Sequence, residues 1–273
     1  SDHAEPEQPG ERAGLRDPMS PAELSSMPAS ISDWESSITE VKVDWNNQVF
    51  TTVTSETGEL WGLVEKLSTE MHLILKQTKP MGSRWTLGEV MCSANSPITE
   101  QVLKSGQSAF RFGLEQGDLS TSTGRADLFR KIARHRPKHI WYSPTCGPWS
   151  SWSQFNAARS IQHHQEYVQM RRNLLYQIAL GTVLYRHQME TKSHFHWEQP
   201  QKSLMFHGPN LSEFHEHTRA CQFDMCRAGG LVDPENQMPM KKGMTVLTTF
   251  EPLYKRFHGM TCDHRHQHQP IEG

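Results

Sequence analysis

Short apolar segments alternate with amphipathic helical segments through the middle of the chain, and this alternation limits the possible folds most strongly. The expected strands lie at residues 87–92, 109–114, 139–142, 194–198 and 245–249. The expected helices lie at residues 97–105, 124–135 and 163–189. Strands that alternate with helices predict a parallel sheet with helices on both faces. We therefore expect an α/β fold built on a Rossmann-like, doubly wound, mostly parallel sheet.

The chain before this region has a different composition. Residues 1–40 carry nine acidic and two basic side chains and few large aliphatic ones, so they are expected to form a disordered acidic tail. Residues 41–53 alternate as in a hairpin, and apolar residues then recur at helical spacing up to Pro80. The sequence thus suggests four segments: a tail at 1–40, a hairpin-and-helix extension at 41–80, a main α/β domain at 81–250 and a Cys/His-rich end at 251–273.

Charge and cysteine content narrow the partners and the compartment. The net charge is −2, and removing the tail's −7 leaves +5 for the remainder, which is compatible with a polyanionic partner such as nucleic acid. The five cysteines are widely spaced and follow no signal peptide, which favours a reducing, intracellular compartment. The sequence has no apolar run of 18 residues, so no membrane span is expected. Because it begins at Ser1, we expect a processed product or a piece of a longer protein.

Three candidate reactive side chains follow successive expected strands. Asp118 comes after the second strand, Cys146 after the third, and Glu198 ends the fourth. Taken singly, they are readily interpreted as a turn residue, a small buried hydrophobe and a surface charge. Together at one sheet edge they predict a different chemistry: a thiolate that adds to a ring while a carboxylic acid protonates a ring nitrogen.

The order of these motifs resembles that of the cytosine-C5 DNA methyltransferases. It consists of Gly117-Asp118-Leu119, then Pro144-Thr145-Cys146 with Ser150 four residues on, then Glu198, all between about residues 87 and 250. The resemblance implies a class I S-adenosylmethionine-dependent methyltransferase fold. It implies that Cys146 attacks C6 of cytosine and that Glu198 protonates N3. It also places Asp118 at the adenine of S-adenosylmethionine, with further cofactor contacts from Cys92, Ser93, Leu119 and Pro144.

The family extrudes its target base from the duplex, because neither face of a stacked cytosine is accessible. The candidate nucleic-acid contacts are Ser150, Trp149, Trp152, Lys241 and Lys242. Trp149 and Trp152 lie beyond the third strand and could stack at the mouth of the pocket. The two lysines fall where the family keeps a basic strand motif.

A looser likeness points to the methyltransferase-like segments of retroelement polyproteins. It involves Cys221, the run at residues 238–242 and the Cys/His-rich end. It implies a nuclear location and contacts with other parts of a longer polyprotein, which would also supply DNA specificity.

A catalytically degenerate domain is the alternative. The loop after the first strand, residues 92–96, has no glycine, and no target-recognition domain follows residue 249. These departures from the family pattern favour a nucleic-acid-binding or structural domain that keeps the fold and the turn without the cofactor.

The end of the chain carries candidate metal ligands. In an extended segment alternate residues face one side, so His264, His266 and His268 could converge there with nearby thiolates. The expected zinc ligands are Cys221, Cys262, His264 and His266. A solvated His-rich tail without metal is the other reading.

Overall fold

The computed structural model describes residues 42–207 and 212–269, so the tail expected at residues 1–40 lies outside the described residues. The chain divides into two compact units, Ser1–Val53 and Thr54–Gly273. The hairpin prediction for residues 41–53 is wrong, because residues 42–53 belong to helix α3, Lys42–Gln77. No glycine or proline occurs between Lys42 and Gly58, so nothing in this stretch interrupts a helix.

The second unit is built on one six-stranded sheet, with strands in the order β2-β1-β3-β4-β6-β5. The strands are β1 Leu87–Val90, β2 Ala109–Phe112, β3 His139–Tyr142, β4 His194–Pro200, β5 Arg219–Asp224 and β6 Gly243–Thr248. β6 is antiparallel to both of its neighbours, and the other pairs are parallel. The expected mixed α/β fold with a mostly parallel sheet is thus present, and it is compatible with a Rossmann-like arrangement.

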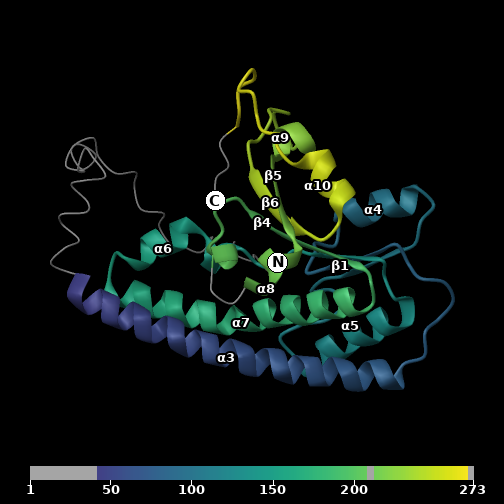
Figure 1. Ribbon diagram of the computed structural model, residues 1–273. Helices are drawn as coiled ribbons and strands as arrows, with labels where there is room; N and C mark the ends of the chain where they lie inside the picture. The colour runs from purple at the N-terminus through teal and green to yellow at the C-terminus, as the bar shows by residue number, and fades with distance from the viewer. Residues whose placement is uncertain (1–41, 208–211, 270–273) are drawn as a thin grey trace, which may run out of the picture. The chain divides into compact units, whose positions relative to one another are not determined.

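Helices cover both faces of this sheet. Figure 1 shows α3, α5 and α7 on one side and α4 and α10 on the other. The helices after α3 are α4 Pro97–Lys104, α5 Ser122–His135, α6 Ser151–Ala157, α7 Ile161–Glu190, α8 Ser212–His217, α9 Met225–Ala228 and α10 Glu251–Phe257, with 3₁₀ turns η1 Gly147–Trp149 and η2 Leu204–His207. Among residues 42–207 and 212–269, no helix is long and apolar enough to cross a membrane.

The main core lies between one face of the sheet and the helices α3, α5 and α7. The C-terminal part of α3 belongs to this core, because Leu60, Val64, Leu67 and Met71 are buried at helical spacing. These α3 residues therefore share one core with side chains of the region at 81–250. A smaller apolar cluster lies between β5, β6 and α10.

The contact between α7 and the sheet leads to a stability prediction at Gly181. A Cβ there would lie 2.7 Å from the Trp197 ring and 2.8 Å from the Tyr142 ring, and both rings are fully buried. Gly181→Ala should lower the free energy of unfolding by about 1–3 kcal/mol in urea denaturation, because the core has no room for the methyl group. Gly62→Ala in α3 is the matched control, since a Cβ there meets nothing within 4 Å. The control should gain up to about 1 kcal/mol from helix propensity. Equal stabilisation of both variants would contradict this packing.

Candidate functional site

A cavity opens at the carboxyl ends of β1, β2 and β3. The chain passes from β1 to β2 on one side and later to β3 on the other, and α/β sheets bind ligands at such a reversal. Its empty volume is about 580 Å³, a figure that includes open solvent at the mouth. The lining residues are Met91, Cys92, Gly113, Leu114, Gly117, Asp118, Leu119, Thr145, Tyr176 and Gln177. We call this cavity the strand-end pocket.

Of the five residues expected at the cofactor, the strand-end pocket contains Cys92, Asp118 and Leu119. Ser93 is exposed in the loop beyond Cys92, and Pro144, two residues before Cys146, is buried. Neither of these two residues lines the pocket.

Two backbone features shape the floor of the pocket. The loop after β1 lacks glycine, yet Met91 adopts a positive φ of 60°, a conformation in which a non-glycine residue is strained. Gly113, directly after β2, takes the place of a loop glycine, because a Cβ there would collide with the carbonyl oxygen of Cys92. A glycine after β2 thus lets the ends of β1 and β2 pack closely together at the pocket.

The electrostatics differ between the wall and the rim of the pocket. Burial raises the pKa of Cys92 to about 11, so this thiol is protonated at neutral pH and forms a neutral wall. Hydrogen bonding from Ser120 lowers the pKa of Asp118, and the exposed Asp118 carboxylate accepts from the Ser120 backbone N–H at 2.9 Å. The rim thus presents a charged acceptor beside Leu114, whose side chain is 81% exposed.

The Cys146 turn, residues 143–150, is fixed by hydrogen bonds along its length. The Ser143 N–H donates to the Val90 carbonyl of β1 at 3.1 Å. The Thr145 N–H donates to Gln177 Oε1 of α7 at 3.0 Å. Pro148 starts the 3₁₀ turn that follows Cys146, where the fixed φ of proline is favourable. The half-buried thiol is therefore carried by a rigid loop at the end of β3.

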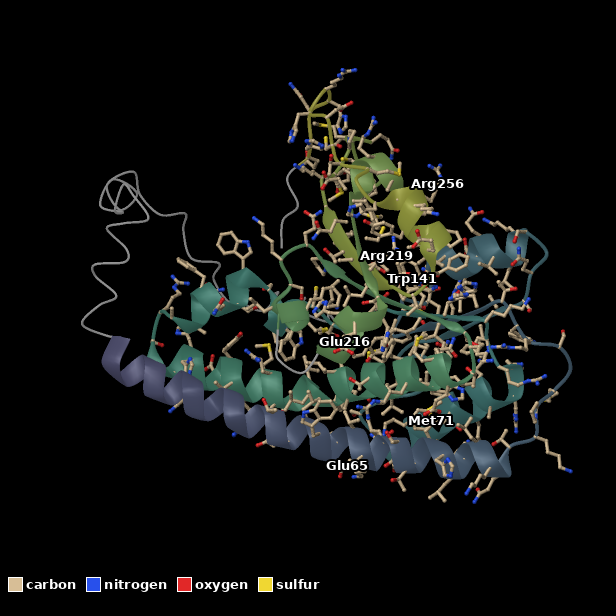
Figure 2. The ribbon with its side chains drawn as sticks, viewed as in Figure 1. Glu65, Met71, Trp141, Glu216, Arg219 and Arg256 are labelled. Atoms are coloured by element: carbon tan, nitrogen blue, oxygen red, sulfur yellow. The ribbon has the colours of Figure 1, made fainter. Side chains whose placement is uncertain are left out.

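Glu198 is joined to the same turn. Trp141 Nε1 of β3 donates to Glu198 Oε2 at 2.7 Å, and Ser143 Oγ donates to the same oxygen at 3.0 Å. Trp141 lies in the face of the sheet opposite α7 (Figure 2). β4 runs on to Pro200, so Glu198 lies two residues before the end of its strand rather than at the end. Within the described residues, Glu198 Oε1 accepts no hydrogen bond.

The aromatic candidates for base stacking differ in exposure. Trp149 is only 2% exposed, and the Arg171 guanidinium lies 4.6 Å from its ring centroid. The predicted role of Trp149 at the mouth of the pocket is therefore wrong, because this ring is a core side chain. Trp152 on α6 is 74% exposed and is free to stack. Ser150 caps α6, accepting from the Ser153 N–H at 3.1 Å.

Lys241 and Lys242 immediately precede β6 instead of lying in a strand. Both side chains are exposed. Because β6 is antiparallel to β4 and β5, its first residues lie at the same sheet edge as the carboxyl ends of the other strands. The two lysines are therefore at the edge that carries the pocket and the Cys146 turn.

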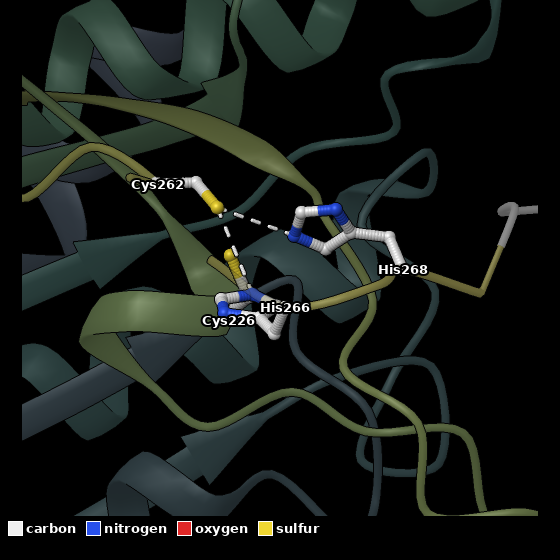
Figure 3. Close-up of side chains that lie close together, drawn as sticks. All are labelled: Cys226, Cys262, His266 and His268. Atoms are coloured by element: carbon white, nitrogen blue, oxygen red, sulfur yellow. Dashed lines mark hydrogen bonds between the residues drawn. The ribbon is translucent and has the colours of Figure 1, made fainter. Parts of the chain in front are cut away.

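A Cys/His cluster that could hold a metal ion lies beyond the end of β5. It consists of Cys226, Cys262, His266 and His268, whose ligand atoms all lie within 4.8 Å of one another. Figure 3 shows both histidine rings directed at the Cys262 sulfur. Cys226 and His268 take the places that the sequence assigned to Cys221 and His264, and this part of the prediction is wrong.

Burial in β5 keeps Cys221 out of the cluster, and one backbone angle keeps His264 out of it. Cys221 is fully buried in β5 among apolar side chains. His264 has a φ of 56°, which breaks the alternation of an extended segment, and its Nε2 lies 3.3 Å from Lys241 Nζ. Only His266 and His268 therefore converge on the thiols.

Comparison of the chain with protein-family models, curated proteins and solved structures finds no match. The functional assignment below therefore depends on the geometry of the site and on the motif resemblance.

Proposed function

We propose that this chain is an S-adenosylmethionine-dependent methyltransferase of the class I fold that methylates C5 of cytosine in DNA through Cys146. One observation carries the proposal: three chemically distinct features lie at the carboxyl ends of parallel strands in one sheet. They are the strand-end pocket with Asp118 after β2, the Cys146 turn after β3, and Glu198 near the end of β4. α/β folds bind their ligands at the carboxyl ends of the strands.

The lining of the strand-end pocket fits the cofactor's chemistry. The exposed Asp118 carboxylate can accept from an amino or hydroxyl group, and Leu114 offers an apolar surface for a flat ring. Gly113 lets the chain after β2 pack directly against the Cys92 backbone beside the pocket. When bound there, S-adenosylmethionine would supply the methyl group.

The proposed reaction needs a nucleophile and an acid, which are two different side chains. The Cys146 thiolate forms a bond to C6 of an extruded cytosine, and the ring electrons move toward C5 and N3. After C5 has taken up the methyl group, its proton is lost to solvent and the C6–S bond breaks, which restores the ring and releases the Cys146 thiolate. Glu198 is suited to hold the proton at N3, since its Oε1 is left open while Oε2 is fixed by Trp141 and Ser143. The hydrogen bond from Ser143 couples the position of the acid to the turn that carries the thiol.

Nucleic acid is the proposed partner, and nuclear action within a longer polyprotein is the proposed setting. Trp152, exposed on α6, provides a stacking surface. Lys241 and Lys242 supply positive charge at the same sheet edge for phosphate contacts. Ser150 is proposed as a further polar contact at the end of the turn. Zinc enters this proposal only as a structural ion, away from the reacting groups.

Covalent trapping tests the proposed reaction. The full chain is incubated with S-adenosylmethionine and a random-sequence duplex that contains 5-fluorocytosine, and a second arm uses the matching RNA. A complex that survives denaturing electrophoresis with the DNA is expected, because fluorine at C5 blocks release of the enzyme. Trapping by RNA alone would move the substrate from DNA to RNA. No adduct with either would contradict the reaction.

A binding domain without cofactor is the second candidate, and the loop after β1 favours it. Met91 adopts a left-handed conformation without glycine, so the cofactor side of the pocket departs from the family pattern more than the Cys146 turn does. Retained DNA binding together with absent S-adenosylmethionine binding would support this candidate.

A further inference from the structure

The C-terminal segment, residues 262–269, folds back onto the corner between β5 and α9. Its first residue is held by Asp224, whose Oδ2 accepts from the Cys262 N–H at 2.8 Å. Its last is held by the Gln269 N–H, which donates to the Pro239 carbonyl at 2.9 Å. Between these two anchors, Cys262, His266 and His268 approach Cys226 of α9.

We propose that Cys226, Cys262, His266 and His268 bind a structural zinc ion that clamps the C-terminal segment to the β5–α9 corner. The donor set consists of two sulfurs and two imidazole nitrogens, which zinc prefers and which magnesium and calcium do not. Four protein ligands leave no open position, as in structural rather than catalytic zinc sites. Binding releases the two thiol protons to solvent, so two thiolates and Zn²⁺ make the site neutral.

The distances agree with a shared ion. With Zn–S of about 2.3 Å and Zn–N of about 2.05 Å, a sulfur and a nitrogen on one tetrahedral zinc lie about 3.6 Å apart. Cys262 Sγ lies 3.6 Å from His266 Nε2 and 3.3 Å from His268 Nε2. A single thiol proton can be donated to only one of these two nitrogens. A cation between the four donors satisfies all of them together.

The surroundings of Cys262 resemble the outer shell of a metal site. The His264 N–H donates to Cys262 Sγ at 3.3 Å, which stabilises a thiolate. Asp224, 5% exposed, orients the Cys262 backbone through the bond described above. Outer-shell partners of this kind orient the ligands and strengthen metal binding. The left-handed turn at His264 is what lets the chain return its two later histidines to the same sulfur.

The zinc site is independent of the methyl-transfer proposal, because none of its four ligands lines the strand-end pocket. Metal content can therefore be high while methyl transfer is absent, or the reverse. The two proposals fail separately.

Metal analysis of the full chain, purified in reductant and without a metal-chelating column, is the test. About one zinc per folded chain is expected. Cobalt in place of zinc should give the d–d bands of a tetrahedral ion and thiolate-to-cobalt charge transfer. Fewer than about 0.3 zinc per folded chain after addition of zinc, or octahedral cobalt spectra, would overturn the proposal.

Two histidine variants test the ligand set. His268→Asn should weaken zinc binding by more than the roughly 10- to 100-fold expected for loss of an outer-shell partner such as in Asp224→Ala. His264→Asn is the matched control, since its ring nitrogens are not among the four clustered ligand atoms and its backbone bond to Cys262 Sγ does not depend on the ring. It should keep the wild-type affinity. Affinity is measured by competition with a chromophoric chelator on samples checked for folding by circular dichroism. Loss in His264→Asn with retention in His268→Asn would overturn the assignment.

The clamp itself is tested by limited proteolysis of the wild-type chain. A protease should cleave residues 262–269 after zinc is removed by chelation. When zinc is restored, the initial rate of this cleavage should be at least tenfold lower. Equal cleavage with and without zinc would show that the ion does not hold the segment. This measurement needs no variant, so it stands even if the His268→Asn chain fails to fold.

Discussion

Replacement of Cys146 by serine should abolish the covalent complex with 5-fluorocytosine DNA and lower methyl transfer by about 10³-fold or more. The reason is that a serine hydroxyl is a far weaker nucleophile than a thiolate at neutral pH. The turn itself should stay intact, since its anchors are the backbone of Ser143 and Thr145 and not the sulfur. Scintillation counting of methyl groups transferred to DNA, together with denaturing electrophoresis, gives both readouts.

S-adenosylmethionine affinity provides the control for Cys146→Ser. Cys146 does not line the strand-end pocket, so the variant should bind the cofactor as the wild type does. An adduct that persists in the serine variant would exclude Cys146 as the nucleophile.

Glu198→Gln should lower the rate of methyl transfer by about 10²–10⁴-fold, the range typical for loss of a general acid. Glutamine keeps an oxygen that can accept from Trp141 and Ser143, so the geometry described by those two bonds is retained. The amide cannot transfer a proton to N3. Rates are measured in single turnover with saturating cofactor, so that binding and chemistry are separated.

Glu216→Gln is the matched control for Glu198→Gln. Glu216 is an exposed glutamate on α8, labelled in Figure 2, and it contacts neither the turn nor the pocket lining. Its variant should retain the wild-type rate. Equal losses in the two variants, or a wild-type rate in Glu198→Gln, would remove Glu198 from the proposed mechanism.

Most strands of the fold could be predicted because their apolar character is local. β1, β3 and α7 lie within two residues of their expected bounds. β5 was not predicted, because Arg219–Asp224 has only Cys221 and Phe223 as large apolar residues and lies at the sheet edge. The reversed direction of β6 is set by pairing with β4 and β5, and such nonlocal pairing leaves no periodicity in the sequence.

The positions of Asp118 in the pocket lining and of the Cys146 turn after β3 could be predicted from consecutive residues. The site was not predictable where the chain folds back from afar. Tyr176 and Gln177 reach the pocket from the middle of α7, and there they look like ordinary helix residues. Gly113 could have been found from the sequence, because a glycine beside a strand often indicates that another backbone approaches closely.

The residues of the Cys/His cluster show the same division between local and distant information. Cys262 and His266 could be predicted from the crowded end of the chain. His264 was misassigned, because a left-handed residue in place of an extended one redirects its side chain. Cys226 was missed in favour of Cys221, since only the structure distinguishes a thiol inside the β5 core from one on α9.

Calorimetric titration of S-adenosylmethionine into the full chain tests the central claim, that the strand-end pocket is a cofactor site. Saturable binding of one molecule per chain is expected. Asp118→Ala should weaken it by about 10- to 100-fold, the effect of removing a hydrogen bond to a charged group. Glu115→Ala, in the same loop but outside the lining, should leave the affinity unchanged. No detectable heat at millimolar ligand, or equal affinity in Asp118→Ala and the wild type, would contradict the account.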